Sequence, residues 1–108
     1  MPKHLKKQAH LPTAAEILGL LKATAAEMRR QHGVCTVALF GSYARGTQRR
    51  TSDIDLLVEF DDRAVSLFDV LKLEADLTAR WGRPVHVTER TAVPERARAR
   101  IETEALVA

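Results

Sequence analysis

The sequence predicts an α/β fold, of the kind also classed as α+β, in which helices pack against a small mixed sheet of about three strands. Segments 34–40 and 54–60 are short apolar runs bounded by turn residues, which is typical of buried strands. Segments 14–32 and 67–81 each follow a capping residue and carry apolar side chains at helical spacing. A short alternating run at 84–88 predicts the third strand. The expected order is helix, strand, short helix, strand, helix, strand, helix.

Length and composition bound the class of protein. The chain has 108 residues, 45% of them hydrophobic, which suits one globular core but leaves no room for a second substrate-binding module. The formal net charge of +3 permits an anionic ligand without establishing one. No apolar run is long enough to cross a membrane, and no signal-peptide core follows the basic start, so we expect a cytoplasmic protein.

Residues 1–12 are expected to form a flexible basic tail, and one folded domain is expected to span 13–108. No aromatic side chain is interleaved with the basic residues of the tail. Because aromatic residues commonly accompany basic ones in nucleic-acid contacts, we do not expect this protein to bind nucleic acid directly.

The first helix is expected to start at Thr13, because Thr13 and Glu16 form a capping box. Gly33 is a suitable C-cap, and His32 just before it suits the negative end of the helix dipole. The predicted apolar face consists of Ile17, Leu18, Leu21, Ala25 and Met28. We interpret this helix as scaffold, with His32 serving its end alone.

A Gly-Ser turn joins the first two predicted strands. Gly41 permits close backbone approach, and Ser42 is expected to act as N-cap of a helical turn that runs through Arg45. Free N–H groups at a helix start suit the phosphates of a nucleotide. Cys35, in the first of these strands, has an apolar sequence context and is expected to be buried and reduced.

Two aspartates open the second strand. Asp53 and Asp55 are two residues apart, so on a strand they point to the same face. Two adjacent, partly buried carboxylates repel each other unless a cation lies between them, and Mg²⁺ prefers carboxylate and phosphate oxygens. A phosphate cradle beside this pair predicts phosphoryl or nucleotidyl transfer. The structural alternative has Asp53 capping the strand and Asp55 pairing with Arg45.

The second half of the chain is expected to supply packing. After a turn at 61–63, Ser66 and Asp69 resemble another cap, and Trp81 is expected in the core. The apolar positions assigned to this helix are Leu67, Phe68, Val70, Leu71, Leu73, Ala75, Leu77 and Trp81. Pro94 opens a last helix that is expected to run to Val107, and its thin apolar stripe favours packing on a partner.

The pattern of Gly41, Ser42, ten further residues, Asp53 and Asp55 resembles the signature of the DNA polymerase beta superfamily of nucleotidyltransferases. The fuller form, GSYARGT followed by SDIDLLVEF, resembles the minimal (MNT-domain) branch, and the likeness extends from about Thr13 to the C-terminus. The resemblance implies a polymerase-beta-like nucleotidyltransferase fold. It also implies that Asp53 and Asp55 are catalytic and bind Mg²⁺, while Gly41 and Ser42 bind the phosphates of ATP.

We add Arg45 to the nucleotide-binding set, although ordering the loop through a salt bridge or hydrogen bonds is the simpler role for this residue. Arg49 and Arg50 follow on the same loop. They are either exposed charge or contacts for phosphate or an acidic partner.

Members of this family carry a third carboxylate on the next strand, and here His86 occupies that position, between Val85 and Val87. A neutral imidazole can accept a proton near pH 7, so His86 is a candidate catalytic base. It is a poorer ligand for Mg²⁺ than for Mn²⁺ or Zn²⁺. Glu89 is expected on the opposite face of the strand and does not substitute. The alternative is a decayed site in which His86 is only a polar residue.

The resemblance implies the antitoxin of a type VII-like HEPN/MNT toxin–antitoxin pair. Such a protein transfers AMP from Mg-ATP to a tyrosine hydroxyl of its HEPN-domain RNase toxin, with which it forms a hetero-oligomer. A partner surface is also expected because nothing in the sequence predicts the second wall of a substrate cleft. One alternative is a catalytically degenerate protein that neutralises the toxin by binding alone. Another is a small-molecule nucleotidyltransferase, although those enzymes carry an extra domain.

Overall fold

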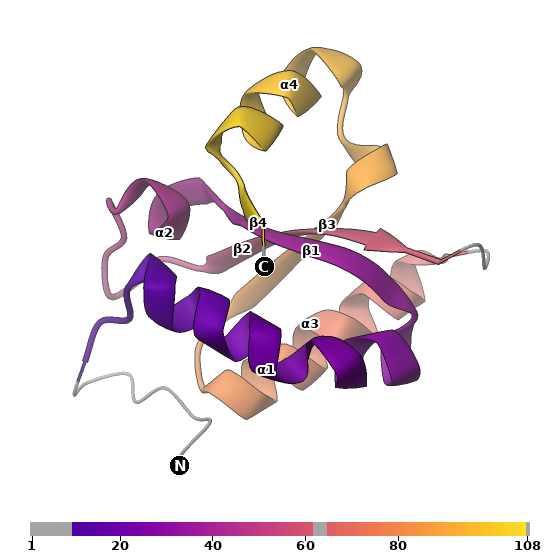
Figure 1. Cartoon of the computed structure of the whole chain (residues 1–108), viewed down its shortest axis with the longest axis horizontal. Helices are drawn as coiled ribbons and strands as arrows, with labels where there is room; N and C mark the ends of the chain where they lie inside the picture. Colours follow the sequence, from indigo (N-terminus) through magenta and orange to yellow (C-terminus); the bar gives the residue numbers. More distant parts are fainter. Residues whose placement is uncertain (1–9, 62–64, 108) are drawn as a thin grey trace.

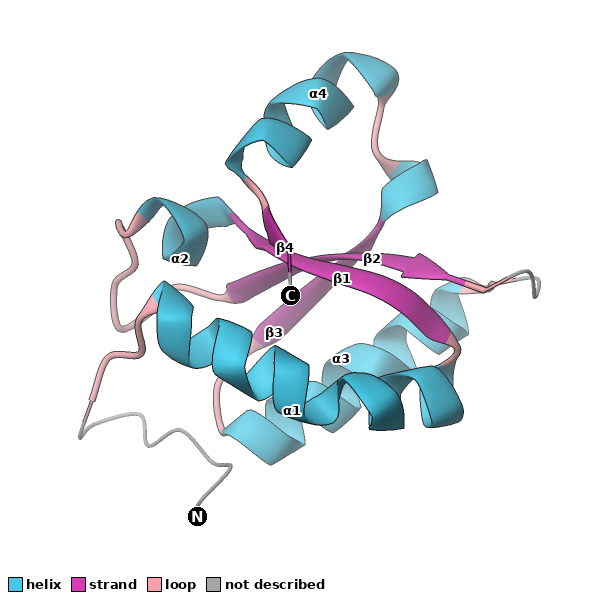
Figure 2. Cartoon of the chain, in the orientation of Figure 1, coloured by secondary structure: helices cyan, strands magenta, loops and turns pink. Residues whose placement is uncertain are grey.

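The computed structural model describes residues 10–61 and 65–107. Figures 1 and 2 show the helices on both sides of a central sheet. The helices are α1 (Ala14–His32), α2 (Gly41–Arg45), α3 (Leu67–Trp81) and α4 (Glu95–Glu104), with a 3₁₀ turn η1 (Arg90–Ala92). The strands are β1 (Val34–Phe40), β2 (Ile54–Phe60), β3 (Val85–Glu89) and β4 (Leu106–Val107). The predicted α/β class and order of elements are confirmed, apart from the additional η1 and β4.

The sheet is mixed, with the strand order β3-β2-β1-β4. Strand β2 pairs antiparallel with β1 and parallel with β3, while β4 pairs antiparallel with β1. We predicted about three strands and a last helix continuing to Val107. The helix instead ends at Glu104, and Leu106 and Val107 pair with Leu39 and Ala38. Helix α4 has no buried side chain, so a longer helix would gain no stability from packing. Pairing with β1 satisfies the backbone hydrogen bonds of Leu106 and Val107 instead.

Helices α1 and α3 cover one face of the sheet, and α4 stands over the other (Figure 1). The core lies between α1, α3 and the sheet, and Trp81 is fully buried in it as predicted. Tyr43 anchors the short helix α2 in the same core. No helix of the described residues is both long and apolar enough to cross a membrane.

Both predicted capping boxes form. The Thr13 hydroxyl accepts from the Glu16 backbone N–H, and Ser66 caps α3 through Asp69 in the same way. Gly33 and Gly82 end α1 and α3 in the left-handed conformation, which suits residues without a Cβ.

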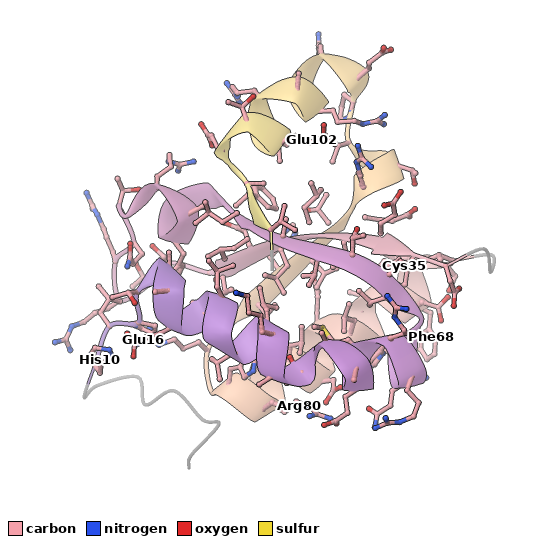
Figure 3. All side chains as sticks on the ribbon, viewed as in Figure 1. His10, Glu16, Cys35, Phe68, Arg80 and Glu102 are labelled. Carbon is pink, nitrogen blue, oxygen red and sulfur yellow. The ribbon has the colours of Figure 1, made fainter. Side chains whose placement is uncertain are left out.

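The predicted buried face of α3 is correct only toward its C-terminal end. Leu73, Leu77 and Trp81 are buried, whereas Phe68 and Leu71 are 69% and 50% exposed (Figure 3 labels Phe68). The exposed set also includes Leu67 and Ala75. The helix contacts the sheet through one narrow face, so an apolar stripe this wide cannot all be covered.

Cys35 is exposed, so the prediction that it is buried is wrong (Figure 3). The register of β1 with β2 shifts between Val34 and Thr36, and both Cys35 and Thr36 are exposed while Val34 is buried. Apolar sequence context does not reveal such a shift.

The predicted N-terminal tail is described only from His10 onward, and the domain boundary at residue 13 stays a prediction. The Arg83 guanidinium donates a hydrogen bond to the His10 carbonyl (3.0 Å), and the Gln48 amide donates to the Pro12 carbonyl (2.8 Å). Pro12 itself is buried. His10 and Pro12 therefore contact the domain. The turn predicted at 61–63 is described only at Asp61, and Asp62 and Arg63 lie outside the described residues.

His32 does more than serve the end of α1. Its Nε2 lies 2.9 Å from Asp76 Oδ2 on α3, and Arg80 Nε donates to the other oxygen of Asp76 at 2.9 Å. Burial would raise the pKa of the Asp76 carboxyl, but the hydrogen bonds from Arg80 and His32 outweigh burial and hold this pKa below its usual range. Arg80 also pairs with Glu27 of α1, so this polar cluster joins α1 and α3.

Candidate active site

Three strand ends meet at one edge of the sheet. Strand β1 runs antiparallel to β2, and β2 runs parallel to β3, so the end of β1 lies beside the starts of β2 and β3. In the observed register, Asp55 pairs with Phe40 on one side and with His86 on the other. The structure therefore brings Gly41, Asp55 and His86, which are far apart in sequence, to one place.

Gly41 lies directly against Asp55. A Cβ at position 41 would overlap Asp55 Oδ2 and lie 3.1 Å from Cγ. Gly41 also has φ +74°, a backbone conformation that L side chains rarely adopt. A residue without a side chain is therefore required at position 41, and the neighbour that makes it necessary is Asp55, whereas close approach of a phosphate stays a prediction.

Asp55 is half-buried, whereas Asp53 precedes β2 and is exposed. Burial raises the pKa of the Asp55 carboxyl above its usual range, and the Asp53 carboxylate raises it further. His86 and Arg45 offset part of this rise. The aspartates are thus close enough to repel each other, and a cation between them would relieve that repulsion.

His86 lies beside Asp55 on the neighbouring strand β3. The distance between His86 Nδ1 and Asp55 Oδ1 is 3.9 Å, which is within ion-pair range but beyond hydrogen-bond range. The His86 side chain is 59% exposed, so its imidazole is accessible to a molecule arriving from solvent. Glu89 lies opposite Val58, three positions along β3, and its carboxylate contacts Thr91. As expected, Glu89 does not join the site.

Ser42 is not an N-cap, so that prediction is wrong. Helix α2 begins at Gly41, its N-cap residue is Phe40, and no side chain forms a cap hydrogen bond there. The left-handed Gly41 turns the chain into α2 one residue earlier than expected. The Ser42 carbonyl accepts a hydrogen bond from Thr47 N (2.9 Å), which closes the turn. The contact of Ser42 with phosphate stays a prediction.

Arg45 forms a salt bridge, but with neither the loop nor Asp55. Its Nη1 lies 3.1 Å from Glu104 Oε2 at the end of α4. The structural alternative for Asp55, pairing with Arg45, is therefore not what the structure shows. Arg49 and Arg50 are exposed on the loop before β2, and their role stays open.

The two aspartates fit Mg²⁺ as part of a nucleotide complex. Within the described ranges, no group of three or more His, Cys, Asp or Glu side chains could hold a metal ion. Mg²⁺, however, is commonly bound by one or two carboxylates plus substrate phosphates. Asp53 and Asp55 offer two such carboxylates, and that of Asp55 lies directly against the backbone at Gly41. This donor set suits a metal that arrives with phosphates better than an all-protein cage.

Helix α4 provides a wall that the sequence did not predict. A cavity of about 400 Å³ lies between α2 and α4, beside Gly41, and its lining consists of Phe40, Gly41, Arg45, Arg100, Ile101 and Glu104. Neither Asp53, Asp55 nor His86 lines this cavity, so the expectation that a partner supplies the second wall of the substrate cleft stays a prediction. Helix α4 faces the cavity with Ile101 of its thin apolar stripe and with the charged Arg100 and Glu104.

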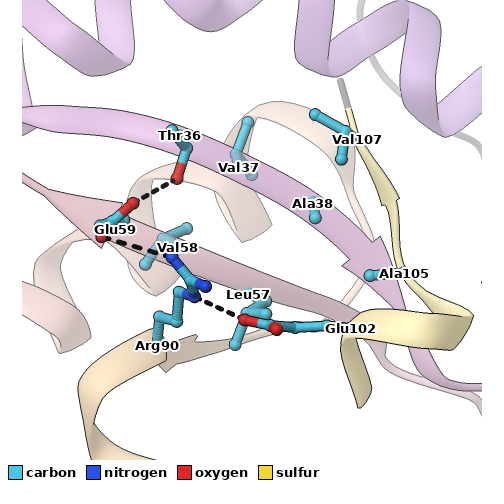
Figure 4. A pocket seen from close by; sticks show the side chains of 10 residues that line it. All are labelled: Thr36, Val37, Ala38, Leu57, Val58, Glu59, Arg90, Glu102, Ala105 and Val107. Atoms are coloured by element: carbon cyan, nitrogen blue, oxygen red, sulfur yellow. Dashed lines mark hydrogen bonds and ion pairs between the residues drawn. The ribbon is translucent and has the colours of Figure 1, made fainter. Parts of the chain in front are cut away.

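A second cavity, of about 320 Å³, lies between α4 and the exposed face of the sheet (Figure 4). Arg90 crosses it, contacting Glu102 of α4 at 2.6 Å and Glu59 of β2 at 3.6 Å. The Glu102 carboxylate holds the pKa of Arg90 above its ordinary value. Because neither Gly41 nor the aspartate pair lines this cavity, we assign it no part in the chemistry.

Residues 21–108 match the family model described as the nucleotidyltransferase domain. A candidate protein adenylyltransferase from Methanocaldococcus jannaschii is 41% identical over 76 residues, which cover 70% of this chain and 81% of that protein. Protein adenylyltransferase MntA from Thermococcus cleftensis is 36% identical over 81 residues, covering 75% of this chain and 81% of the relative.

Solved structures share the fold. A candidate minimal nucleotidyltransferase superposes with a TM-score of 0.75 and 31% identity, over 91% of this chain and 97% of that one. A toxin–antitoxin with AMP-PNP gives a TM-score of 0.67 at 23% identity, covering 80% and 70%. A tri-AMPylated Shewanella oneidensis HEPN toxin in complex with MNT antitoxin gives 0.61 at 18%, covering 82% and 69%. At such identities, the last two likenesses establish the fold alone.

Proposed function

This chain belongs to the nucleotidyltransferase domain family, and on that basis we propose that it is an antitoxin acting as a protein adenylyltransferase. Its substrate is Mg-ATP, and its acceptor is a tyrosine hydroxyl of a cognate HEPN-domain RNase toxin. The observation that carries the proposal is the contact between Gly41 and Asp55, with Asp53 two residues before Asp55 in the chain. The names of the relatives support the protein acceptor, and the HEPN partner rests on the complexes that share this fold.

The chain binds the nucleotide along the turn after β1. The triphosphate lies against the turn at Gly41 and Ser42, where the glycine lets the backbone pass directly against the Asp55 carboxylate. Asp53 and Asp55 hold Mg²⁺, which when bound neutralises phosphate charge and orients the reacting oxygens. The raised pKa of Asp55 fits this role, because the carboxylate gains most from a nearby cation when burial disfavours its charge.

Transfer proceeds by in-line displacement at the α-phosphorus. The acceptor hydroxyl oxygen forms a bond to this phosphorus while the bond to the bridging oxygen breaks, and pyrophosphate leaves with that electron pair. His86 accepts the hydroxyl proton. Its exposed ring, 3.9 Å from Asp55 at Nδ1, is accessible to an acceptor presented by a partner.

The second candidate function is neutralisation by binding alone. One observation favours it: the position where the family carries its third carboxylate is His86, and no third acidic side chain of the described residues joins Asp53 and Asp55. In this alternative the fold is retained and the toxin is covered rather than modified. Both candidates require a complex with the partner, and they differ only in whether AMP is transferred.

Intact mass spectrometry of the partner separates the candidates. The purified chain is incubated with the partner encoded beside it, ATP and Mg²⁺, and in parallel with Mn²⁺. We expect the partner to gain one or more AMP masses, and Asp53→Asn to abolish this gain while the complex still forms. A stable complex without mass gain under either metal would reject the transferase and leave the binding role.

The position of the modification is read in the same experiment. Peptide fragmentation of the AMP-bearing partner identifies the acceptor side chain. Modification of a tyrosine is the expected result. Modification of a serine or threonine instead would support the adenylyltransferase activity but show that the acceptor is not a tyrosine.

A further inference from the structure

The cavity between α2 and α4 opens beside Gly41, and neither Asp53 nor Asp55 is part of its lining. Gly41 contacts the Asp55 carboxylate and also lines this cavity of about 400 Å³. A ligand that spans Gly41 therefore reaches both the Asp55 carboxylate and this cavity. The volume is large enough for a group of several heavy atoms.

The charges around this cavity are unequal. Arg45 and Arg100 line it from α2 and α4, and Glu104 is the one carboxylate in its lining. Arg45 is already paired with Glu104. Among residues 10–61 and 65–107, Arg100 has no hydrogen-bond or ion-pair partner. One cation at the cavity is therefore left without a counter-charge.

The pair between Arg45 and Glu104 is suited to exchange. Their side chains are 49% and 36% exposed, and exposed ion pairs contribute about 0–1 kcal/mol to stability. A phosphate group carries more charge than a carboxylate and accepts two parallel hydrogen bonds from one guanidinium. Phosphate can thus displace Glu104 from Arg45 without disturbing the core.

We propose that this cavity binds the polyphosphate end of a nucleoside triphosphate, the part that leaves as pyrophosphate. Arg100 and Arg45 contact its oxygens, and Glu104 competes with it for Arg45. This inference rests on the proposed function and deepens it. It makes α4 part of the nucleotide site, and it gives Arg100 the role of selecting triphosphate over monophosphate.

Calorimetric titration of the full-length chain tests the assignment with three probes: ATP with Mg²⁺, AMP, and inorganic tripolyphosphate with Mg²⁺. The variant is Arg100→Ala, and Arg96→Ala on the same helix, outside the cavity lining, is the matched control. We expect Arg100→Ala to raise the dissociation constants of ATP and tripolyphosphate about threefold to tenfold, a range typical of losing a partly exposed charge-assisted contact. AMP binding stays within error of the control.

Glu104→Gln provides the opposite change. Without its carboxylate competitor, Arg45 is available to phosphate, so we expect tighter binding of ATP and tripolyphosphate with unchanged binding of AMP. Both effects are expected to shrink as salt rises, since the groups are exposed. Circular dichroism verifies that each variant is folded.

The outcomes separate this inference from the proposed function. The subsite is wrong if Arg100→Ala binds ATP as tightly as Arg96→Ala does, or if its affinities for ATP and AMP fall by the same factor. AMP transfer to the partner can still occur in either case. If tripolyphosphate binding depends on Arg100 but the partner never gains AMP, the subsite stands and the transferase is wrong. If the protein binds tripolyphosphate but does not bind ATP, the cavity is a general anion site and the nucleotide assignment is wrong.

Discussion

Gly41 and Asp55 are in such close contact that any side chain at position 41 would overlap the carboxylate Oδ2. The two residues belong to different elements, Gly41 to α2 and Asp55 to β2, and they meet because β1 and β2 pair antiparallel. The absence of a side chain at one residue leaves room for the carboxylate of the other. This contact joins the turn that suits phosphate to the carboxylates that suit a metal.

Gly41→Ala is expected to destabilise the fold and abolish nucleotide binding. The matched control is Gly46→Ala, because Gly46 has the same φ of +74° but nothing lies within 4 Å of its added Cβ. We expect the control to lose about 1–2 kcal/mol from the left-handed backbone alone, and Gly41→Ala to lose about 1–3 kcal/mol more from the overlap. Urea denaturation measures both. Equal losses would mean that the contact with Asp55 is unimportant.

Asp55→Asn is expected to raise the melting temperature of the metal-free protein at pH 7 while abolishing AMP transfer. Because the pKa of Asp55 is raised in the folded state, its favourable contribution is present below its unfolded pKa and is lost as pH rises through the folded pKa. At pH 7 the charged form therefore costs stability, and asparagine removes that cost.

Thermal melts in EDTA at pH 3 and pH 7 test this expectation for Asp55. The gain is expected at pH 7 and absent at pH 3, where aspartate is protonated in both states. Asp53→Asn, at the exposed carboxylate, is the control and should give a smaller gain, because it removes the repulsion between the two carboxylates but not the cost of burying Asp55. A melting temperature lower than that of the parent at pH 7 would contradict the argument from burial.

His86→Ala and His86→Asp together test the unusual third position. If His86 accepts the proton, His86→Ala lowers AMP transfer about 100-fold, a usual magnitude for a general base. His86→Asp supplies a carboxylate beside Asp55, so we expect this variant to retain most of the activity and to bind Mg²⁺ with a dissociation constant about tenfold lower. Initial rates and metal titrations give the two quantities. An unchanged rate in His86→Ala would support the view of His86 as an inert polar residue.

Asp76→Asn is expected to destabilise the protein by about 1 kcal/mol at pH 7, because it weakens hydrogen bonds from His32 and Arg80 that join α1 to α3. The pKa of Asp76 is lowered in the folded state, so its contribution is present above its unfolded pKa and is lost as pH falls through the folded pKa. Urea denaturation at pH 7 and pH 2.5 checks this prediction. A difference between parent and variant that persists at pH 2.5 would point to packing rather than charge.

Local patterns carried most of the fold prediction. The capping boxes at Thr13 and Ser66, the glycine ends at Gly33 and Gly82, and the bounds of β1 and β2 agree with the structure. These features depend on residues within about four positions of each other, so the sequence displays them directly. The spacing of Gly41, Asp53 and Asp55 likewise predicted that a turn and a strand start would carry the site.

The errors share a different cause. The exposure of Phe68 depends on which narrow face of α3 contacts the sheet, and that of Cys35 on a register shift in β1. The two-residue strand β4 exists only because β1 offers it an edge. Each is decided by a neighbour far away in sequence, and apolar character alone does not identify that neighbour.

The sequence by itself therefore determined the helices, the first three strands and the residues that define the family. Only the tertiary structure decided that Asp55 lies against Gly41, that His86 stands 3.9 Å from it, and that Arg45 is paired with Glu104 across a cavity lined by α4. Caps and periodicity are properties of neighbouring residues along the chain. The depth of a carboxylate, the counter-ion of an arginine and the wall of a cavity depend on segments that meet only when the sheet and its covering helices have formed.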